Sequence, residues 1–291
     1  MRACKTGRCR KSGRLAFNCT ASLYRRGVRA LFGARAIWVV AGCLLLVLAH
    51  SLPPSASAQG PGLAAGQQQP GYTSRQQQPG YTAGAATADS IGKRYMGREI
   101  SRVMGWQGAA WLERAERERE ERTDLLLEAL ELKPGMVAAD IGAGTGYLSR
   151  RMAEAVAPSG RVLAVDVQPE MVAMLRRTAQ QQGIRNLEPS LGTEKDVGLA
   201  AGSVDLAVMV DVYHELSFPY EVLDSIVRSL KPGGRLVFVE YRAEDAGVPI
   251  KALHKMSEAQ IRLEAQVHPV DWERTVKSLP WQHIVVFRRR S

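Results

Sequence analysis

Cysteine is absent from most of this sequence, and its absence limits the chemistry of the chain. The four cysteines, Cys4, Cys9, Cys19 and Cys43, all precede residue 59. The remaining residues therefore form no disulfide, offer no thiolate to a metal and supply no thiol nucleophile. Such a composition is compatible with an oxidising compartment.

Acidic residues are missing from the N-terminal part of the chain. Residues 1–58 contain ten Lys and Arg residues and no Asp or Glu, although the whole chain carries 39 basic and 29 acidic residues. Residues 59–291 are therefore formally neutral, with 29 residues of each sign. A neutral body lacks the basic stripe of a nucleic-acid-binding protein, so we expect no nucleic-acid partner.

The chain also lacks an apolar run of membrane-spanning length. The longest run, AIWVVAGCLLLVLA at 36–49, has 14 residues, whereas a transmembrane helix needs about 20. Basic residues precede it, and Ala56-Ser57-Ala58 follows with the small-residue pattern of a cleavage site. We therefore expect residues 1–58 to be a signal peptide and the protein to be exported, either periplasmic or secreted. A membrane anchor at 36–49 and a lipoprotein at Cys43 are the alternatives.

Residues 59–90 contain a near-perfect repeat, QQQPGYTSR followed by QQQPGYTAG. Gln, Pro and Gly bury too little apolar surface to offset the chain entropy lost on folding. This segment is predicted to be a disordered linker, and residues 91–291 have the length of one ordinary domain.

Residues 91–132 read as helical, which predicts an N-terminal helical extension. Glu113/Arg117 and Glu118/Arg122 are spaced as (i, i+4) pairs, so the central part is expected to be a solvated helix face. The motif LKPG then occurs twice, at 132–135 and 230–233, each time between a helical pattern and an apolar run.

Strand and helix patterns alternate beyond residue 135. The expected strands are 136–141, 161–167, 186–192, 204–212, 236–240, 271–276 and 281–288. Such alternation predicts an α/β fold with a doubly wound, mostly parallel sheet that is covered on both faces.

The segment Asp140-Ile141-Gly142-Ala143-Gly144-Thr145-Gly146 joins the first of these strands to a helix. Glycine permits positive φ and lets a ligand approach the backbone closely. Dinucleotide enzymes use the spacing G-x-G-x-x-G, which would place the third glycine where this chain has Tyr147. An NAD-linked oxidoreductase is therefore the less favoured alternative.

Four features together resemble class I S-adenosylmethionine (SAM) methyltransferases. They are DIGAGTG, the acid Asp166 ending RVLAVDV, the strand VDLAVMVDV and the joint LKPGGRL. The resemblance is strongest over 135–240 and is closest to the ubiquinone/menaquinone-methyltransferase-like branch, especially exported bacterial members. It implies a Rossmann-like sheet of seven strands with the last strand antiparallel. It also implies SAM as the cofactor and methyl transfer to an unidentified small-molecule acceptor.

The same resemblance assigns residues to the cofactor. The glycines contact the methionine part, Asp140 supports the loop, and Asp166 accepts hydrogen bonds from the ribose hydroxyls. Thr193 stands where the family usually has an Asp for the adenine, and Glu194 or Asp196 is the alternative for that contact. The full set is Asp140, Gly142, Ala143, Gly144, Thr145, Gly146, Asp166, Val167, Thr193, Glu194 and Asp211.

The acceptor site is expected at the end of the fourth strand, where the chain reads Asp211-Val212-Tyr213-His214-Glu215. His214 has the ordinary pKa of a general base. Glu215 would orient His214 or bind a cationic substrate, and Tyr213 would contact the sulfonium through a cation–π interaction. Alternatively, His214 only packs below the cofactor. One histidine and two carboxylates make a poor metal site, so no metal is expected.

Other segments are expected to flank the pocket. They are a lid at 95–99, Trp106 and Trp111 in an apolar wall, Glu240–Arg242 after the fifth strand, and 253–256 near the acceptor. Because SAM is made in the cytosol, an exported chain has a second interpretation as a non-catalytic SAM- or nucleoside-binding module. Membrane contact is expected only through the signal segment, and the oligomeric state is not predicted.

Overall fold

The structure is a computed structural model that describes residues 80–291. The predicted signal peptide and most of the predicted linker lie outside the described residues. Among residues 80–291, no helix combines the length and the apolar composition needed to cross a bilayer.

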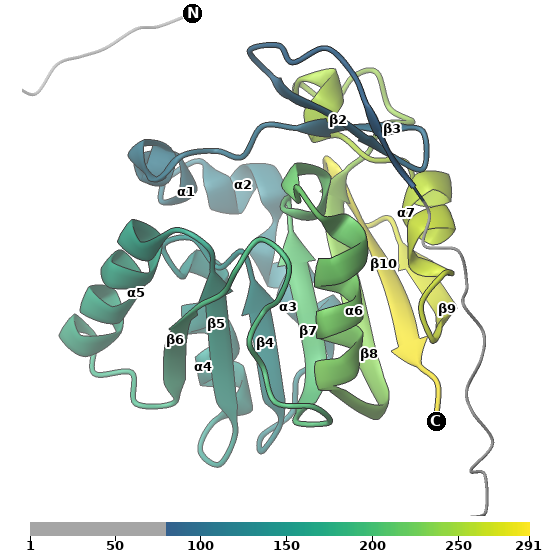
Figure 1. Cartoon of the computed structure of the whole chain (residues 1–291). Helices are drawn as coiled ribbons and strands as arrows, with labels where there is room; N and C mark the ends of the chain where they lie inside the picture. The colour runs from purple at the N-terminus through teal and green to yellow at the C-terminus, as the bar shows by residue number, and fades with distance from the viewer. Residues whose placement is uncertain (1–79) are drawn as a thin grey trace, which may run out of the picture. The chain divides into compact units, whose positions relative to one another are not determined.

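A seven-stranded sheet forms the centre of the molecule (Figure 1), in the order β6-β5-β4-β7-β8-β10-β9. Its strands are β4 (Val137–Ile141), β5 (Arg161–Asp166), β6 (Leu187–Leu191), β7 (Val204–Val210), β8 (Leu230–Tyr241), β9 (Val270–Val276) and β10 (Gln282–Arg289). Neighbours from β6 to β8 pair in parallel, whereas β10 pairs antiparallel with both β8 and β9. The predicted α/β sheet of seven strands with an antiparallel last strand is confirmed.

Helices cover both faces of this sheet because its central strands are apolar on both sides. Successive residues of β4 belong to different hydrophobic clusters: Ala139 packs with helices α6 (Pro219–Ser229) and α7 (Glu258–Ala265). Ala138 packs with the other three helices. These are α3 (Thr123–Leu130), α4 (Tyr147–Val156) and α5 (Pro169–Gln181).

The N-terminal extension differs from its prediction. It begins with a three-stranded antiparallel sheet of β1 (Tyr81–Ala83), β2 (Ser90–Tyr95) and β3 (Arg98–Ser101). The predicted linker boundary at residue 90 and the predicted helix from residue 91 are therefore wrong for this part. Met96 and Gly97 both have positive φ, 48° and 87°, which matches the tight turn of a hairpin.

Short helices follow this small sheet. The helical pattern of the sequence correctly predicted them for the second half of the N-terminal extension. They are the 3-10 turn η1 (Trp106–Gly108), α1 (Ala109–Leu112) and α2 (Arg117–Glu121), which lead into α3.

The small sheet is attached to the C-terminal half of the domain. The Arg98 guanidinium donates to both carboxylate oxygens of Glu264 on α7, at 2.7 and 2.9 Å. The Ser101 hydroxyl donates to the carbonyl of His214 in the 3-10 turn η2 (Tyr213–Glu215). Figure 1 shows β2 and β3 beyond the carboxyl ends of β7 and β8. The extension therefore covers the edge where α/β folds bind ligands.

Candidate active site

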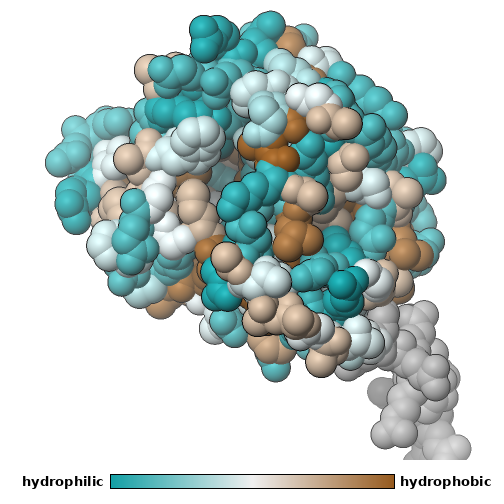
Figure 2. Space-filling model, turned by 90° about the horizontal axis from the view of Figure 1, so that it is seen from above, coloured by the Kyte–Doolittle hydropathy of each residue, from teal (hydrophilic) through white to brown (hydrophobic). Residues whose placement is uncertain are grey.

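A cavity of about 600 Å³ opens at the carboxyl ends of the central strands. Its volume lies within the range of small-molecule sites. Figure 2 looks down on this end of the molecule, where hydrophilic side chains surround scattered apolar ones. The predicted site residues that line the cavity are Gly142, Gly144, Asp166, Val167, Thr193, Glu194, Asp211, His214 and Glu215.

The glycine loop provides bare backbone at one wall of the cavity. Gly142 and Gly144 line it, with φ of 72° and 55°. A Cβ on Gly142 would lie 2.5 Å from the Val212 side chain, and one on Gly144 would lie 2.6 Å from Leu112. Both positions therefore require glycine for backbone conformation and for space.

Asp166 ends β5 and directs its carboxylate along the same wall. One oxygen accepts from the Gly144 amide and the other from the Gln168 amide, each at 2.9 Å. Burial raises the pKa of Asp166, and these amide donors lower it again without cancelling the rise. Each carboxylate oxygen has a second lone pair, so Asp166 retains the capacity to accept two hydroxyl donors.

The other predicted members of the loop support this wall from behind and do not line the cavity. Asp140 is buried and accepts from the Ser149 hydroxyl at 2.5 Å, and burial raises its pKa to about 6. Thr145 donates to Glu113 at 2.6 Å. Gly146 faces Leu175 on α5, where a Cβ would clash. Ala143 is also buried away from the cavity.

The loop after β6 reaches the cavity through Thr193 and Glu194. The Thr193 hydroxyl accepts from the amides of Lys195 and Asp196, so it also shapes the turn. Asp196 does not line the cavity, because its carboxylate pairs with Arg228 at 3.3 Å. Of the adenine candidates, Thr193 and Glu194 are therefore placed at the site.

Helix α2 brings charged residues to the cavity that the sequence analysis assigned to solvent. Arg117 and Glu121 are 8% and 6% exposed, so the predicted solvated face is wrong. Glu121 accepts from Arg117 at 2.8 Å and from Arg114 at 2.6 Å. The expected (i, i+4) pairs do not form, because Glu113 precedes α2 and Arg122 follows the last residue of α2 with a φ of 52°.

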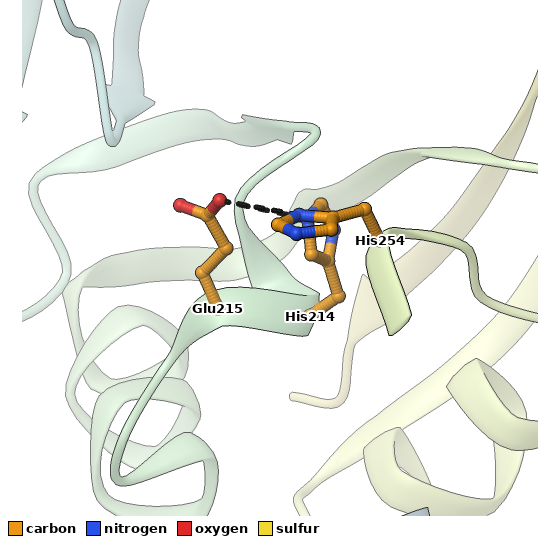
Figure 3. Close-up of side chains that lie close together, drawn as sticks. All are labelled: His214, Glu215 and His254. Carbon is orange, nitrogen blue, oxygen red and sulfur yellow. Dashed lines mark hydrogen bonds and ion pairs between the residues drawn. The ribbon is translucent and has the colours of Figure 1, made fainter. Parts of the chain in front are cut away.

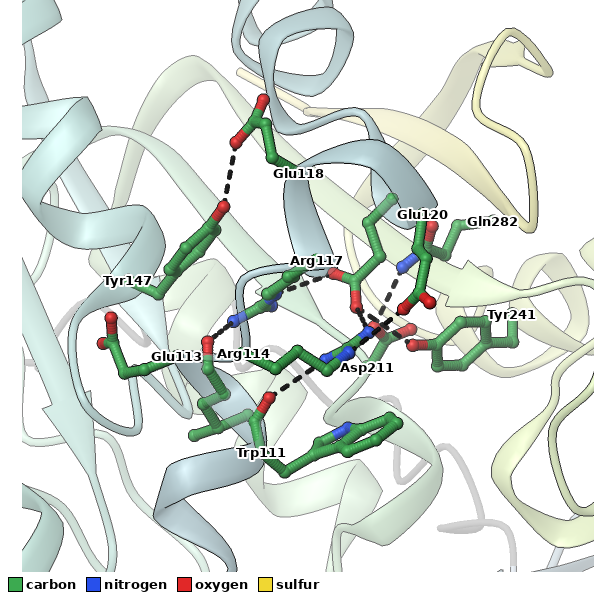
Figure 4. Close-up of polar contacts among 12 residues, drawn as sticks. Trp111, Glu113, Arg114, Arg117, Glu118, Glu120, Tyr147, Asp211, Tyr241 and Gln282 are labelled. Carbon is green, nitrogen blue, oxygen red and sulfur yellow. Dashed lines mark hydrogen bonds and ion pairs between the residues drawn. The ribbon is translucent and has the colours of Figure 1, made fainter.

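Asp211 follows the end of β7 and also lines the cavity. It lies near Arg114 and Arg117 (Figure 4). Its φ of 54° is left-handed, a conformation that Asp tolerates better than most residues. One carboxylate oxygen accepts from the Gln282 amide at 3.0 Å, and the other has no hydrogen-bond partner among residues 80–291. Burial raises the pKa of Asp211 well above its usual range, and the nearby carboxylates of Glu121 and Glu240 raise it further.

His214 also lines the cavity and is held by Glu240 on β8. Its Nδ1 lies 2.6 Å from Oε2 of Glu240, which is fully buried. Its Nε2 lies 3.2 Å from Nδ1 of His254, in the 3-10 turn η3 (Ala252–His254). Burial lowers the pKa of His214, but the Glu240 carboxylate outweighs this effect, so the pKa is raised.

Glu215 completes a group that we call the histidine cluster, defined as His214, Glu215 and His254 (Figure 3). Its Oε1 lies 3.8 Å from Nε2 of His214 and 3.5 Å from Nδ1 of His254. Both Glu215 oxygens accept from the Met104 amide at 3.3 Å. The sequence marked 253–256 and Glu240 only as flanking segments, and no residue spacing pointed to their contact with His214.

Tyr213 does not reach the cavity, so its predicted contact with the sulfonium is wrong. The side chain is fully buried, and its ring packs edge-on against Phe238 with centroids 4.9 Å apart. In the short 3-10 turn, neighbouring side chains point in different directions. His214 therefore faces the cavity while Tyr213 faces the core.

The segment 103–112 covers the cavity, whereas the sequence pattern predicted that residues 95–99 would form this lid. Met104, Trp111 and Leu112 line the cavity, whereas Trp106 does not. The Gln168 side chain fixes this segment by donating to the Met104 carbonyl and accepting from the Trp106 amide. Residues 95–99 instead comprise the ends of β2 and β3 and the Met96–Gly97 turn between them.

This arrangement has the fold of SAM-dependent methyltransferases. A SAM-dependent methyltransferase from Aquifex aeolicus superposes with a TM-score of 0.61 and 25% identity, over 64% of this chain and 99% of that one. A family model described as a methyltransferase domain matches residues 132–283. The chain belongs to this methyltransferase domain family. Its family cofactor is SAM, as the glycine loop and Asp166 predicted.

Curated relatives of this methyltransferase act on different acceptors. An arsenite methyltransferase from Halobacterium salinarum is 31% identical over 36% of this chain and 27% of its own length. A protein-L-isoaspartate O-methyltransferase from Methanothrix thermoacetophila is 33% identical over 39% of this chain and 51% of its own. The chain thus spans about half or less of the length of these relatives. Their differing names do not single out the ubiquinone/menaquinone branch, which stays a prediction.

Proposed function

We propose that this methyltransferase transfers a methyl group from SAM to a small-molecule acceptor. The observation that carries the proposal is that one cavity combines the glycine loop and Asp166 with the histidine cluster. The first two features suit the cofactor, and the cluster supplies groups that bind or deprotonate an acceptor.

The wall residues fit the parts of SAM. The bare backbone at Gly142 and Gly144 admits close contact, and Asp166 has lone pairs for the ribose hydroxyls. Arg114 and Arg117 present guanidinium groups near Asp211, one of whose carboxylate oxygens has no partner within the described part of the chain. A guanidinium and a carboxylate side by side match the carboxylate and ammonium of an α-amino acid.

When bound, SAM supplies an electrophilic methyl group for in-line displacement. The chain must then hold the acceptor atom in line, and proximity supplies much of the rate. His214 presents Nε2 to the cavity because Glu240 holds Nδ1. We propose that His214 helps to remove the acceptor's proton. Because the cavity measures about 600 Å³, cofactor and acceptor share limited space, which favours a small acceptor.

We further propose that the protein acts outside the cytosol and binds no nucleic acid. The support is the cleavage pattern after the apolar run and the formal neutrality of residues 59–291. Recovery of the mature chain from the envelope or culture medium with bound SAM or its demethylated product would support this. Recovery from the cytosol alone would refute export.

Calorimetry with S-adenosylhomocysteine tests the cofactor site. We expect Asp166→Ala to weaken binding at least about 10-fold, because hydrogen bonds to a charged acceptor are each worth about 1.5–3 kcal/mol. Asp271→Ala is the matched control, since Asp271 on β9 pairs with Arg290, directly after β10, and neither residue lines the cavity. Equal affinities in the two variants would count against the proposed site.

Transfer of labelled methyl groups to a cell extract tests the activity itself. Wild type is expected to label a small-molecule fraction, and His214→Asn to label less. Tight cofactor binding without any transfer would support the non-catalytic binding module, and binding of NAD would support the oxidoreductase.

A further inference from the structure

We propose that His214, Glu215 and His254 bind a divalent transition-metal ion in the acceptor part of the cavity. This goes against the expectation of no metal, because the sequence did not show that His254 joins the other two residues. Two imidazoles and one carboxylate form a ligand set that first-row transition metals use with open positions for substrate.

The spacing of the three donor atoms fits one ion. They are Nε2 of His214, Nδ1 of His254 and Oε1 of Glu215, separated by 3.2, 3.5 and 3.8 Å. The point equidistant from the three atoms lies about 2.0 Å from each of them, and Zn–N and Zn–O bonds are about 2.0–2.2 Å. Any three atoms have such a point, and it is the agreement of its distance with metal–ligand bond lengths that supports an ion.

The tautomer of His214 also suits a ligand. Nδ1–H of His214 donates a hydrogen bond to Oε2 of Glu240 at 2.6 Å, which leaves the lone pair of Nε2 directed at the cluster. A carboxylate behind the ligating histidine is the usual arrangement in metal sites, because it orients the ring and raises its basicity. Glu240 is fixed in turn, since it accepts from the Tyr213 amide at 2.8 Å.

Glu215 has no cation of its own among the described residues. Within residues 80–291 its ion-pairing partners are the two histidines, and it forms no ion pair with a lysine or arginine there. A carboxylate that is only 13% exposed at its side chain is costly to hold unpaired. A bound cation would neutralise it, and the open cavity leaves further coordination positions to an acceptor.

The role of the ion rests on the proposed methyltransferase function. A hydroxyl of the acceptor would coordinate the ion, which lowers the pKa of the hydroxyl as it does for metal-bound water. The proton leaves to water, and the oxygen forms a bond to the methyl carbon. The carbon–sulfur bond breaks, and its electron pair stays on sulfur. His214 then assists deprotonation as a ligand, and the acceptor class is a small molecule with an ionisable hydroxyl.

Titration of the chelator-treated full chain with Co²⁺ tests the site. We expect one equivalent to produce visible d–d absorption without a thiolate charge-transfer band. The absence of that band excludes binding by the N-terminal cysteines. His254→Gln is expected to weaken Co²⁺ binding at least about 100-fold, because it removes a ligand. Glu240→Gln should weaken it about 10- to 100-fold, because Glu240 only orients the ligand His214 through a hydrogen bond.

His268→Gln is the matched control, because it makes the same substitution at a histidine that lies outside the cluster. It should bind Co²⁺ like wild type. Binding that His254→Gln leaves unchanged, or no binding of Co²⁺ and Zn²⁺ by wild type, would overturn the metal site. Binding of S-adenosylhomocysteine is measured on the same samples: its loss refutes the proposed function, whereas its presence without metal binding refutes only the metal site.

Discussion

Nδ1 of His214 lies 2.6 Å from Oε2 of Glu240, and both side chains are almost fully buried. A buried imidazole alone would have a lowered pKa. The carboxylate reverses this and fixes which nitrogen faces the cavity. The chemistry of the acceptor site therefore depends on a residue from the neighbouring strand.

The first prediction concerns this pair. Glu240→Gln should lower the pKa of His214, because burial remains while the opposite charge is lost. Carbon-detected NMR titration of chelator-treated protein with labelled histidine measures the change. Wild type should titrate above 6.5, the ordinary value. An unchanged His214 midpoint in the variant would show that Glu240 does not control it.

A second prediction concerns Asp211. Asp211→Asn removes a buried carboxylate whose pKa is raised, and asparagine tolerates the same positive φ. A raised acid pKa means that the folded state holds the proton more tightly, so wild type loses stability as pH rises above 3.8, the ordinary value. The variant should therefore gain stability relative to wild type between pH 5 and pH 8, as urea unfolding measures.

The same variant should bind S-adenosylhomocysteine about 10-fold more weakly, since it loses a charge-assisted hydrogen bond to the ammonium group. Calorimetry at pH 8 checks this outcome. An unchanged affinity would remove Asp211 from the predicted cofactor residues.

The third prediction concerns Gly146, which faces the core and not the cavity and should therefore matter for packing and stability. Gly146→Ala combines a φ of 84° with a clash against Leu175. Gly183→Ala is the control, because Gly183 has φ of 67° but open space around its Cβ position. The control should cost about 1–2 kcal/mol of unfolding free energy. Gly146→Ala should cost about 1–3 kcal/mol more, and similar losses would contradict the packing role.

A fourth prediction concerns acid stability. Burial lowers the pKa of His268 to about 4, against an ordinary 6.5. Between pH 6.5 and pH 4, His268 is therefore protonated in the unfolded chain and neutral in the folded chain. The free energy of unfolding consequently falls as the pH drops through this window. Between pH 7.5 and 5.5 wild type should lose about 1.4 kcal/mol more than His268→Phe. Parallel urea curves of the two proteins would refute this.

The central sheet was predictable because its strands are continuous apolar runs separated by turn residues. Val137–Ile141 and Val204–Val210 are buried on both faces, so no other element accommodates them. The three-stranded N-terminal sheet was not predictable, because its strand β2 (SIGKRY) mixes polar and glycine residues and lacks an apolar run. Its strands are specified by contacts with η2 and α7, which lie more than 100 residues away in the chain.

The candidate site was predictable where local geometry dictates the residue type. Gly142, Gly144 and Asp166 follow from a strand-to-helix turn and a strand end. Arg117 and Glu121 were assigned to solvent, because charged residues are rarely buried without a partner. Their burial depends on a mutual ion pair at 2.8 Å and on Tyr241. The approach of His254 to His214 is likewise a tertiary contact without a local signal.

Residues 103–121 close one side of the cavity, yet they precede the family match at 132–283. The glycine loop, Asp166 and the histidine cluster therefore lie within the matched residues, whereas Arg114 and Arg117, which we propose for the methionine carboxylate of SAM, lie ahead of them. The family match consequently does not account for the whole of the proposed donor pocket.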